Sequence, residues 1–143
     1  MDCYSWLDER ITQFPLASPE EAVCLLGYRD DEDALHLVNE AKKNHQLFAF
    51  NFFNDGKPVG IPLFQIDFDK AQVFAVVPKL CAMLSQLNDI GVYCWLTSFD
   101  EDLGCTPAEA FQNPEKEDTL MYLAGLFVSD STLRNLDFTA ESN

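Results

Sequence analysis

The sequence is poor in positive charge, with nine Lys and Arg against 24 Asp and Glu, which leaves a net charge of −15 over 143 residues. Phosphate backbones and anionic membrane surfaces are bound by clustered cations. This charge balance therefore disfavours tight nonspecific binding to nucleic acid or to such membranes. It favours a basic partner, or merely high solubility.

Long apolar segments and export signals are also lacking. The longest uninterrupted apolar runs, such as 73–77, have five residues, whereas a membrane-spanning helix needs about 20. Residues 1–10 have neither the basic nor the apolar region of a signal peptide. No Cys-x-x-Cys pair occurs among the five cysteines, which are Cys3, Cys24, Cys81, Cys94 and Cys105. We therefore expect reduced thiols, a cytoplasmic location and no membrane partner.

Groups suited to catalysis are scarce. The two histidines, His36 and His45, stand apart from any catalytic motif, and the sequence has no Gly-rich phosphate loop, no Gly-x-Ser-x-Gly and no His-Glu-x-x-His. Asp67 and Asp69 could bind a hard cation from one face of a strand, but an exposed strand face or turn is the favoured interpretation. The sequence predicts that the protein is not an enzyme and has no catalytic residue, no metal ligand and no cofactor.

The composition is otherwise that of a globular protein with a sizeable core, since 48% of the residues are hydrophobic and 13% aromatic. Apolar residues recur at helical spacing in several segments. Ser18 and Thr106 each open a capping box followed by Pro, Asp30 or Asp31 can cap the third helix, and Gly27 ends the second. The predicted helices are 5–14, 18–27, 30–43, 73–87, 89–99, 106–113 and 118–128.

Between the third and fourth helices the pattern becomes strand-like. Residues 47–53 are rich in Phe and end at the turn sequence Asn54-Asp55-Gly56, residues 57–61 form the returning strand, and residues 64–68 alternate once more. The sequence predicts a mainly α fold with a small β-hairpin. Residues 1–70 form a helix-turn-helix-like half with the hairpin as a wing, and residues 71–143 form a helical half, with one continuous domain as the alternative.

A winged helix-turn-helix suggests DNA binding, and Lys42, Lys43 and Lys57 are the candidate DNA contacts. A recognition helix presents Lys, Arg, Asn or Gln to the groove. The candidate helix instead opens with the four acids at 30–33, and its basic pair comes at the far end. The pattern favours a DNA reader and the charge opposes it, so DNA is a doubtful partner.

Four marks follow one another along the chain. They are Ser18-Pro-Glu-Glu-Ala-Val-Cys-Leu-Leu-Gly27, then Leu47-Phe-Ala-Phe50 with Ile61-Pro-Leu-Phe-Gln-Ile-Asp67, then the helix at 78–87, and last Trp95-Leu96 followed by Leu103-Gly-Cys-Thr-Pro-Ala-Glu109. With these four marks in this order, residues 16–128 resemble the Xre/MbcA/ParS-type antitoxins, which are partners of RES-domain toxins. The last mark is similar to the Leu-x-Gly-x-(Thr/Ser)-Pro-x-Glu signature of that family's toxin-binding part.

The resemblance implies an antitoxin that binds a RES-type, NAD-consuming toxin and neutralises it by occupying its active-site cleft, with the NAD chemistry belonging to the toxin. The toxin-binding part of the family matches this chain at Trp95, Leu96, Leu103, Thr106 and Glu109, although Trp95 could equally serve internal packing. A homodimer is left open.

The polar tail after Val128 carries apolar residues without an evident helix face. Leu133, Leu136 and Phe138, with Arg134 among them, either pack back on the core or insert into a partner, and they complete the predicted partner-binding set. Two alternative functions remain. One is an acidic nucleic-acid mimic that inhibits a DNA-binding protein, and the other is a DNA-binding transcriptional regulator.

Overall fold

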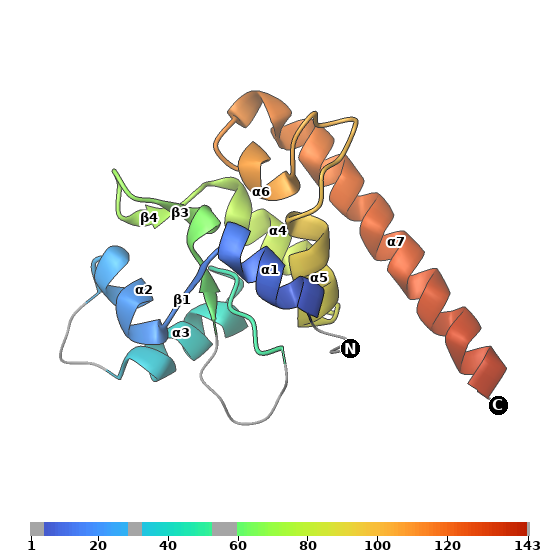
Figure 1. Ribbon diagram of the computed structural model, residues 1–143, viewed down its shortest axis with the longest axis horizontal. Helices are drawn as coiled ribbons and strands as arrows, with labels where there is room; N and C mark the ends of the chain where they lie inside the picture. Colours follow the sequence, from blue (N-terminus) through green and yellow to red (C-terminus); the bar gives the residue numbers. More distant parts are fainter. Residues whose placement is uncertain (1–4, 29–32, 53–59, 143) are drawn as a thin grey trace.

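The computed structural model describes residues 5–28, 33–52 and 60–142, with side chains for all of these except Ser5 and 131–142. The fold is mainly α with small β elements, as the sequence predicts (Figure 1). The helices are α1 (Ser5–Gln13), α2 (Pro19–Leu25), α3 (Ala34–Lys43), α4 (Val76–Leu84), α5 (Asp89–Leu96), α6 (Pro107–Ala110) and α7 (Glu117–Ser142), with short 3-10 turns η1 (Leu63–Gln65) and η2 (Pro114–Lys116). The strands are β1 (Leu16–Ala17), β2 (Ile61–Pro62), β3 (Ile66–Asp67) and β4 (Gln72–Val73).

Local sequence fixes two helix starts as predicted. The Ser18 hydroxyl accepts a hydrogen bond from the Glu21 N–H at 3.2 Å, and the Glu21 carboxylate accepts one from the Ser18 N–H at 3.3 Å. The same reciprocal box forms at Thr106. α3 differs, because its N-cap is Asp33, whose carboxylate accepts from the N–H groups of the next turn. The prediction of Asp30 or Asp31 as the cap is wrong, and both lie outside the described residues. Asp33 directly precedes Ala34, the first residue of α3, so its carboxylate reaches the N–H groups of Leu35 and His36.

The strands are shorter than predicted and pair differently. β1 pairs antiparallel with β2, and β3 with β4. Of the predicted strand 47–53, the described part contributes one antiparallel bridge, in which Phe50 and Gly60 exchange two backbone hydrogen bonds of 2.8 Å. This bridge joins the two arms of the predicted hairpin, whose turn at 54–56 lies outside the described residues. In the predicted strand 64–68, η1 takes the first part and β3 the second.

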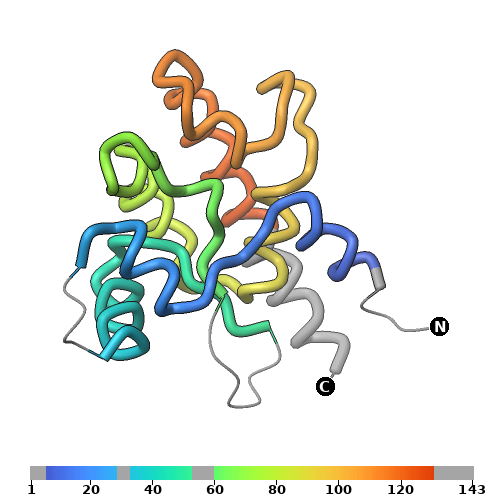
Figure 2. The backbone as a smooth tube through the Cα atoms, turned by 60° about the vertical axis from the view of Figure 1, so that its left-hand side comes forward, coloured from blue at the N-terminus to red at the C-terminus, as the bar shows by residue number. Residues whose placement is uncertain are grey.

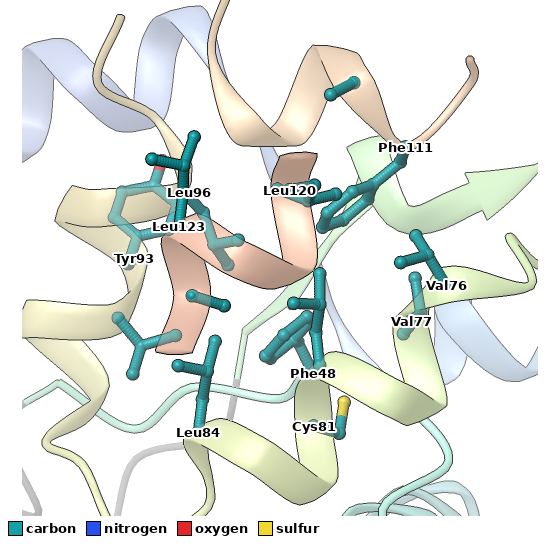
Figure 3. Packing of buried hydrophobic residues seen from close by; sticks show 14 of the residues in the cluster. Phe48, Val76, Val77, Cys81, Leu84, Tyr93, Leu96, Phe111, Leu120 and Leu123 are labelled. Carbon is teal, nitrogen blue, oxygen red and sulfur yellow. The ribbon is translucent and has the colours of Figure 1, made fainter. Parts of the chain in front are cut away.

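Buried side chains form two clusters. The smaller lies where α2 and α3 pack together beside β1 and β2, at one end of the molecule (Figures 1 and 2). The larger gathers α4, α5, α6 and the first part of α7, and Figure 3 shows the Phe48 ring beside Cys81 and Leu84 of α4. Leu7 of α1 and Phe50 also belong to this larger cluster. Residues before position 70 thus help to build the C-terminal core, and a boundary at residue 70 stays a prediction.

α7 is much longer than the predicted helix 118–128, since it continues to Ser142. The prediction that the chain leaves the helix after Val128 is wrong. No Gly or Pro occurs between Ser129 and Ser142, so nothing in this stretch stops a helix that is already formed. α4 and α5 are conversely shorter than predicted, because β4 takes Val73 and Thr97 caps α5.

Across the described residues, no helix combines the length and the apolar character needed to cross a bilayer.

Candidate partner-binding surface

The segment between α5 and α6 is a closed turn. The Asp100 N–H donates to the Cys105 carbonyl at 3.0 Å, and the Gly104 N–H donates to the Asp100 carbonyl at 2.8 Å. The Asp100 carboxylate accepts from the Asp102 N–H at 2.8 Å. Gly104 has φ 73°, in the left-handed region that glycine adopts most readily. Residues 100–105 are therefore held in one conformation by hydrogen bonds within the segment.

The capping box at α6 fixes the other side of this turn. The Glu109 carboxylate accepts from both the N–H and the hydroxyl of Thr106, at 3.0 Å each. These bonds hold the pKa of Glu109 below its ordinary value of 4.5, with the charge of Lys116 adding to the effect. The Lys116 ammonium also donates to the Leu103 carbonyl at 2.7 Å. Thr106 and Glu109 thus have a structural role in shaping the segment.

The structure separates the predicted apolar contacts. Leu96 and Leu103 are 0% and 4% exposed and belong to the core. Neighbouring core residues enclose these two side chains in the isolated chain, so their contact with a partner stays a prediction. Trp95 is partly exposed, and its indole stacks on the Phe127 ring with centroids 5.2 Å apart and planes 8° from parallel. This stack ties α5 to α7 and supports the packing role of Trp95.

Three exposed apolar side chains in the same half of the chain were missed by sequence reasoning. Phe99 is 66% exposed after α5, while Tyr122 and Leu126 of α7 are 67% and 50% exposed. Tyr122 and Leu126 are one helical turn apart, on the side of α7 away from the buried Leu120 and Ala124. The signal was available, because the apolar face predicted for this helix leaves both residues outside it. We call Phe99, Tyr122 and Leu126 the exposed apolar set.

Acidic residues accompany this set. Glu101 and Asp102 are exposed in the turn that follows Phe99, and Asp118 is exposed one turn before Tyr122 on α7. Leu133, Arg134, Leu136 and Phe138 all lie on the C-terminal part of the same helix. Whether they pack on the core or enter a partner stays open.

The three lysines predicted to contact DNA differ in their surroundings. The Lys42 ammonium forms an ion pair with the Asp89 carboxylate at 3.2 Å. The positive charge of Lys42 is therefore compensated within the protein. Lys43 is exposed at the end of α3, and Lys57 lies outside the described residues. Among the residues that the structure describes, no group of three metal-ligating side chains forms.

Comparison with known proteins yields a fold and no family. No protein-family model matches the chain, and no curated protein matches it. The chain is similar to the NMR structure of Rv2175c, with a TM-score of 0.60 and 18% identity over 80% of this chain and 82% of that one. At this identity the likeness concerns the fold alone.

Proposed function

We propose that the protein is an antitoxin-like binding protein that neutralises a RES-type toxin through protein–protein contact. The observation that carries the proposal is the exposed apolar set, with Phe99, Tyr122 and Leu126 each at least half exposed. It lies in the half of the chain that resembles the toxin-binding part of the Xre/MbcA/ParS-type antitoxins.

The physical chemistry of this surface suits a protein partner. Aromatic side chains dominate the binding energy of protein interfaces, where they are buried at the centre of the contact. The exposed acidic residues Glu101, Asp102 and Asp118, in a protein of net charge −15, attract a basic partner and speed its association. A cleft that binds the phosphates of NAD presents such a basic surface. Occupation of that cleft excludes NAD and stops the toxin.

The test is co-expression of the full chain with the RES-domain protein of the same genome, followed by capture of the toxin and measurement of cellular NAD. We expect a stable complex and preserved NAD. Replacing both Tyr122→Glu and Leu126→Glu removes two contacts and adds two charges, and should weaken the complex at least about 30-fold, the loss of one strong interface residue. NAD then falls.

The matched control is Leu35→Glu, which places the same charge at a 40% exposed leucine on α3. This variant should bind as the original protein does. The proposal is contradicted if the toxin is not captured by the full chain, or if the Tyr122/Leu126 variant still captures it with unchanged affinity.

A further inference from the structure

A cavity of about 420 Å³ opens between the end of α3 and the corner that joins α4 to α5. Its volume lies within the range of small-molecule sites, roughly 300–1,000 Å³. Its interior is apolar and consists of buried side chains: Leu47, Phe48, Phe50, Leu84 and Val92. Cys81 adds to this surface as a neutral thiol, since burial raises its pKa to about 12.

The rim of the cavity carries most of its charge. Four charged or titratable side chains line it: Lys42, Lys43, His45 and Asp89. The Asp89 carboxylate accepts from the Lys42 ammonium at 3.2 Å and from the Asn51 N–H at 2.9 Å, so these two opposite charges compensate each other. Lys43 has no carboxylate within ion-pair distance among the described residues. One positive charge is therefore uncompensated at the mouth of an apolar cavity.

The backbone at His45 is strained, with φ 58°. The residue follows the C-cap of α3, where the His45 N–H donates to the Lys42 carbonyl and the Gln46 N–H to the Ala41 carbonyl. α2 ends in the same way, but Gly27 occupies the left-handed position there. His45 thus occupies a position that Gly27 occupies at the end of α2, and residues with such backbone strain cluster at ligand sites.

We propose that this cavity binds a small carboxylic acid with an apolar body. The apolar body lies against the phenylalanines and leucines of the interior, while the carboxylate meets Lys43 and His45 at the rim. A monoanion matches the single uncompensated lysine, whereas a phosphate monoester would bring nearly two charges. This site is separate from the exposed apolar set and does not depend on the proposed antitoxin function.

The experiment uses the full chain and the fluorescent probe 1-anilinonaphthalene-8-sulfonate, an apolar monoanion. We expect saturable binding, displacement by decanoate or 2-naphthoate, and much weaker displacement by decanol, which lacks the charge. The better of the two acids shows whether the natural ligand is aliphatic or aromatic. With that acid, amide NMR shifts should concentrate at residues 45–50 and 84–92.

Two pairs of variants locate the site. Lys43→Glu should weaken binding of the acid about tenfold, as expected for a lost charged hydrogen bond. Lys70→Glu makes the same change at an exposed lysine that does not line this cavity, and should have no effect.

The second pair tests access to the cavity. Ser85→Trp places an indole at the cavity mouth and should abolish binding. Ala82→Trp changes an exposed neighbouring residue outside the lining and should leave binding unchanged. Equal displacement by acid and alcohol, no displacement at all, or binding that survives Ser85→Trp would each overturn the proposal.

Discussion

The side-chain amide of Gln65 hydrogen-bonds both backbone groups of Phe48. The Phe48 N–H donates to Gln65 Oε1 and Gln65 Nε2 donates to the Phe48 carbonyl, at 2.7 Å each. Gln65 is 0% exposed and Phe48 6%. A side chain thus takes the place of a neighbouring strand for a buried segment that has no strand partner at this residue. It also links η1 to the chain that passes between the two core clusters.

Gln65→Leu should therefore be strongly destabilising. The substitution leaves the Phe48 N–H and carbonyl buried without partners, at about 1–3 kcal/mol for each group. We expect the free energy of unfolding, measured with urea, to fall by about 2–6 kcal/mol. Gln13→Leu, at an exposed glutamine at the end of α1, is the matched control and should change it little. A Gln65→Leu protein as stable as the original would show that Phe48 finds other partners.

α2 and α3 both end at a residue with positive φ, which is Gly27 after α2 and His45 after α3. Exchanging the residue type at these two positions should change stability in opposite directions. His45→Gly relieves the left-handed strain and should stabilise the protein by about 1 kcal/mol. Gly27→Ala introduces the same strain and should destabilise it by a similar amount, about 1 kcal/mol. A Cβ at Gly27 would meet nothing within 4 Å, so that change reports the backbone effect alone. Thermal unfolding measures both, and a His45→Gly variant that is less stable would contradict the assignment of strain.

The capping box at α6 should make stability depend on acid pH. Hydrogen bonds from Thr106 lower the pKa of Glu109 in the folded protein, so folding favours its charged form. The resulting stability is present above the ordinary pKa of 4.5 and is lost as the pH falls through the lowered folded value. Glu109→Gln cannot titrate. The difference in unfolding free energy between the two proteins should therefore shrink from pH 7 to pH 3, and a constant difference would exclude this origin.

Thiol reactivity should follow burial. Cys24 is exposed, Cys94 and Cys105 are intermediate, and Cys81 is buried with its pKa raised to about 12 by that burial. The thiolate is the reactive form. Among the four cysteines that the structure describes, we expect Cys24 to react most rapidly with a thiol reagent in the native protein and Cys81 to react only on unfolding. Cys24→Ser should therefore remove one rapidly reacting thiol, and Cys81→Ala should not. All five thiols should react in denaturant without a reductant, and a stable disulfide would contradict the expected reducing compartment.

Deletion of residues 129–143 distinguishes the two roles of the C-terminal part of α7. If its apolar residues pack on the core, the deletion should lower the unfolding free energy by roughly 2–5 kcal/mol. If they enter the toxin, stability should hardly change while toxin inhibition is lost. A truncated protein with unchanged melting and unchanged inhibition would exclude both roles and leave the surface between Trp95 and Leu126.

Most helices could be predicted from sequence, because their signals are local. The capping boxes at Ser18 and Thr106 and the glycine at position 27 act through hydrogen bonds and backbone angles within one turn. The β-structure was predicted poorly. The aromatic run at 47–53 indicates that these side chains are buried, but it does not show which groups bind the backbone of the segment. Its backbone groups could be satisfied by Gln65 only once η1 had been placed beside it, which no local pattern shows.

The candidate site divides in the same way. The sequence by itself determined the mainly α class, the acidic charge and the apolar positions Trp95, Leu96 and Leu103. Only the tertiary structure decided that Leu96 and Leu103 are core while Phe99, Tyr122 and Leu126 are exposed. It alone also brought Lys43 and His45 to the rim of a cavity whose lining comes from two separate segments, 39–50 and 81–92. Composition limits how much apolar surface a chain must bury, but the packing of whole helices against one another selects which side chains remain outside.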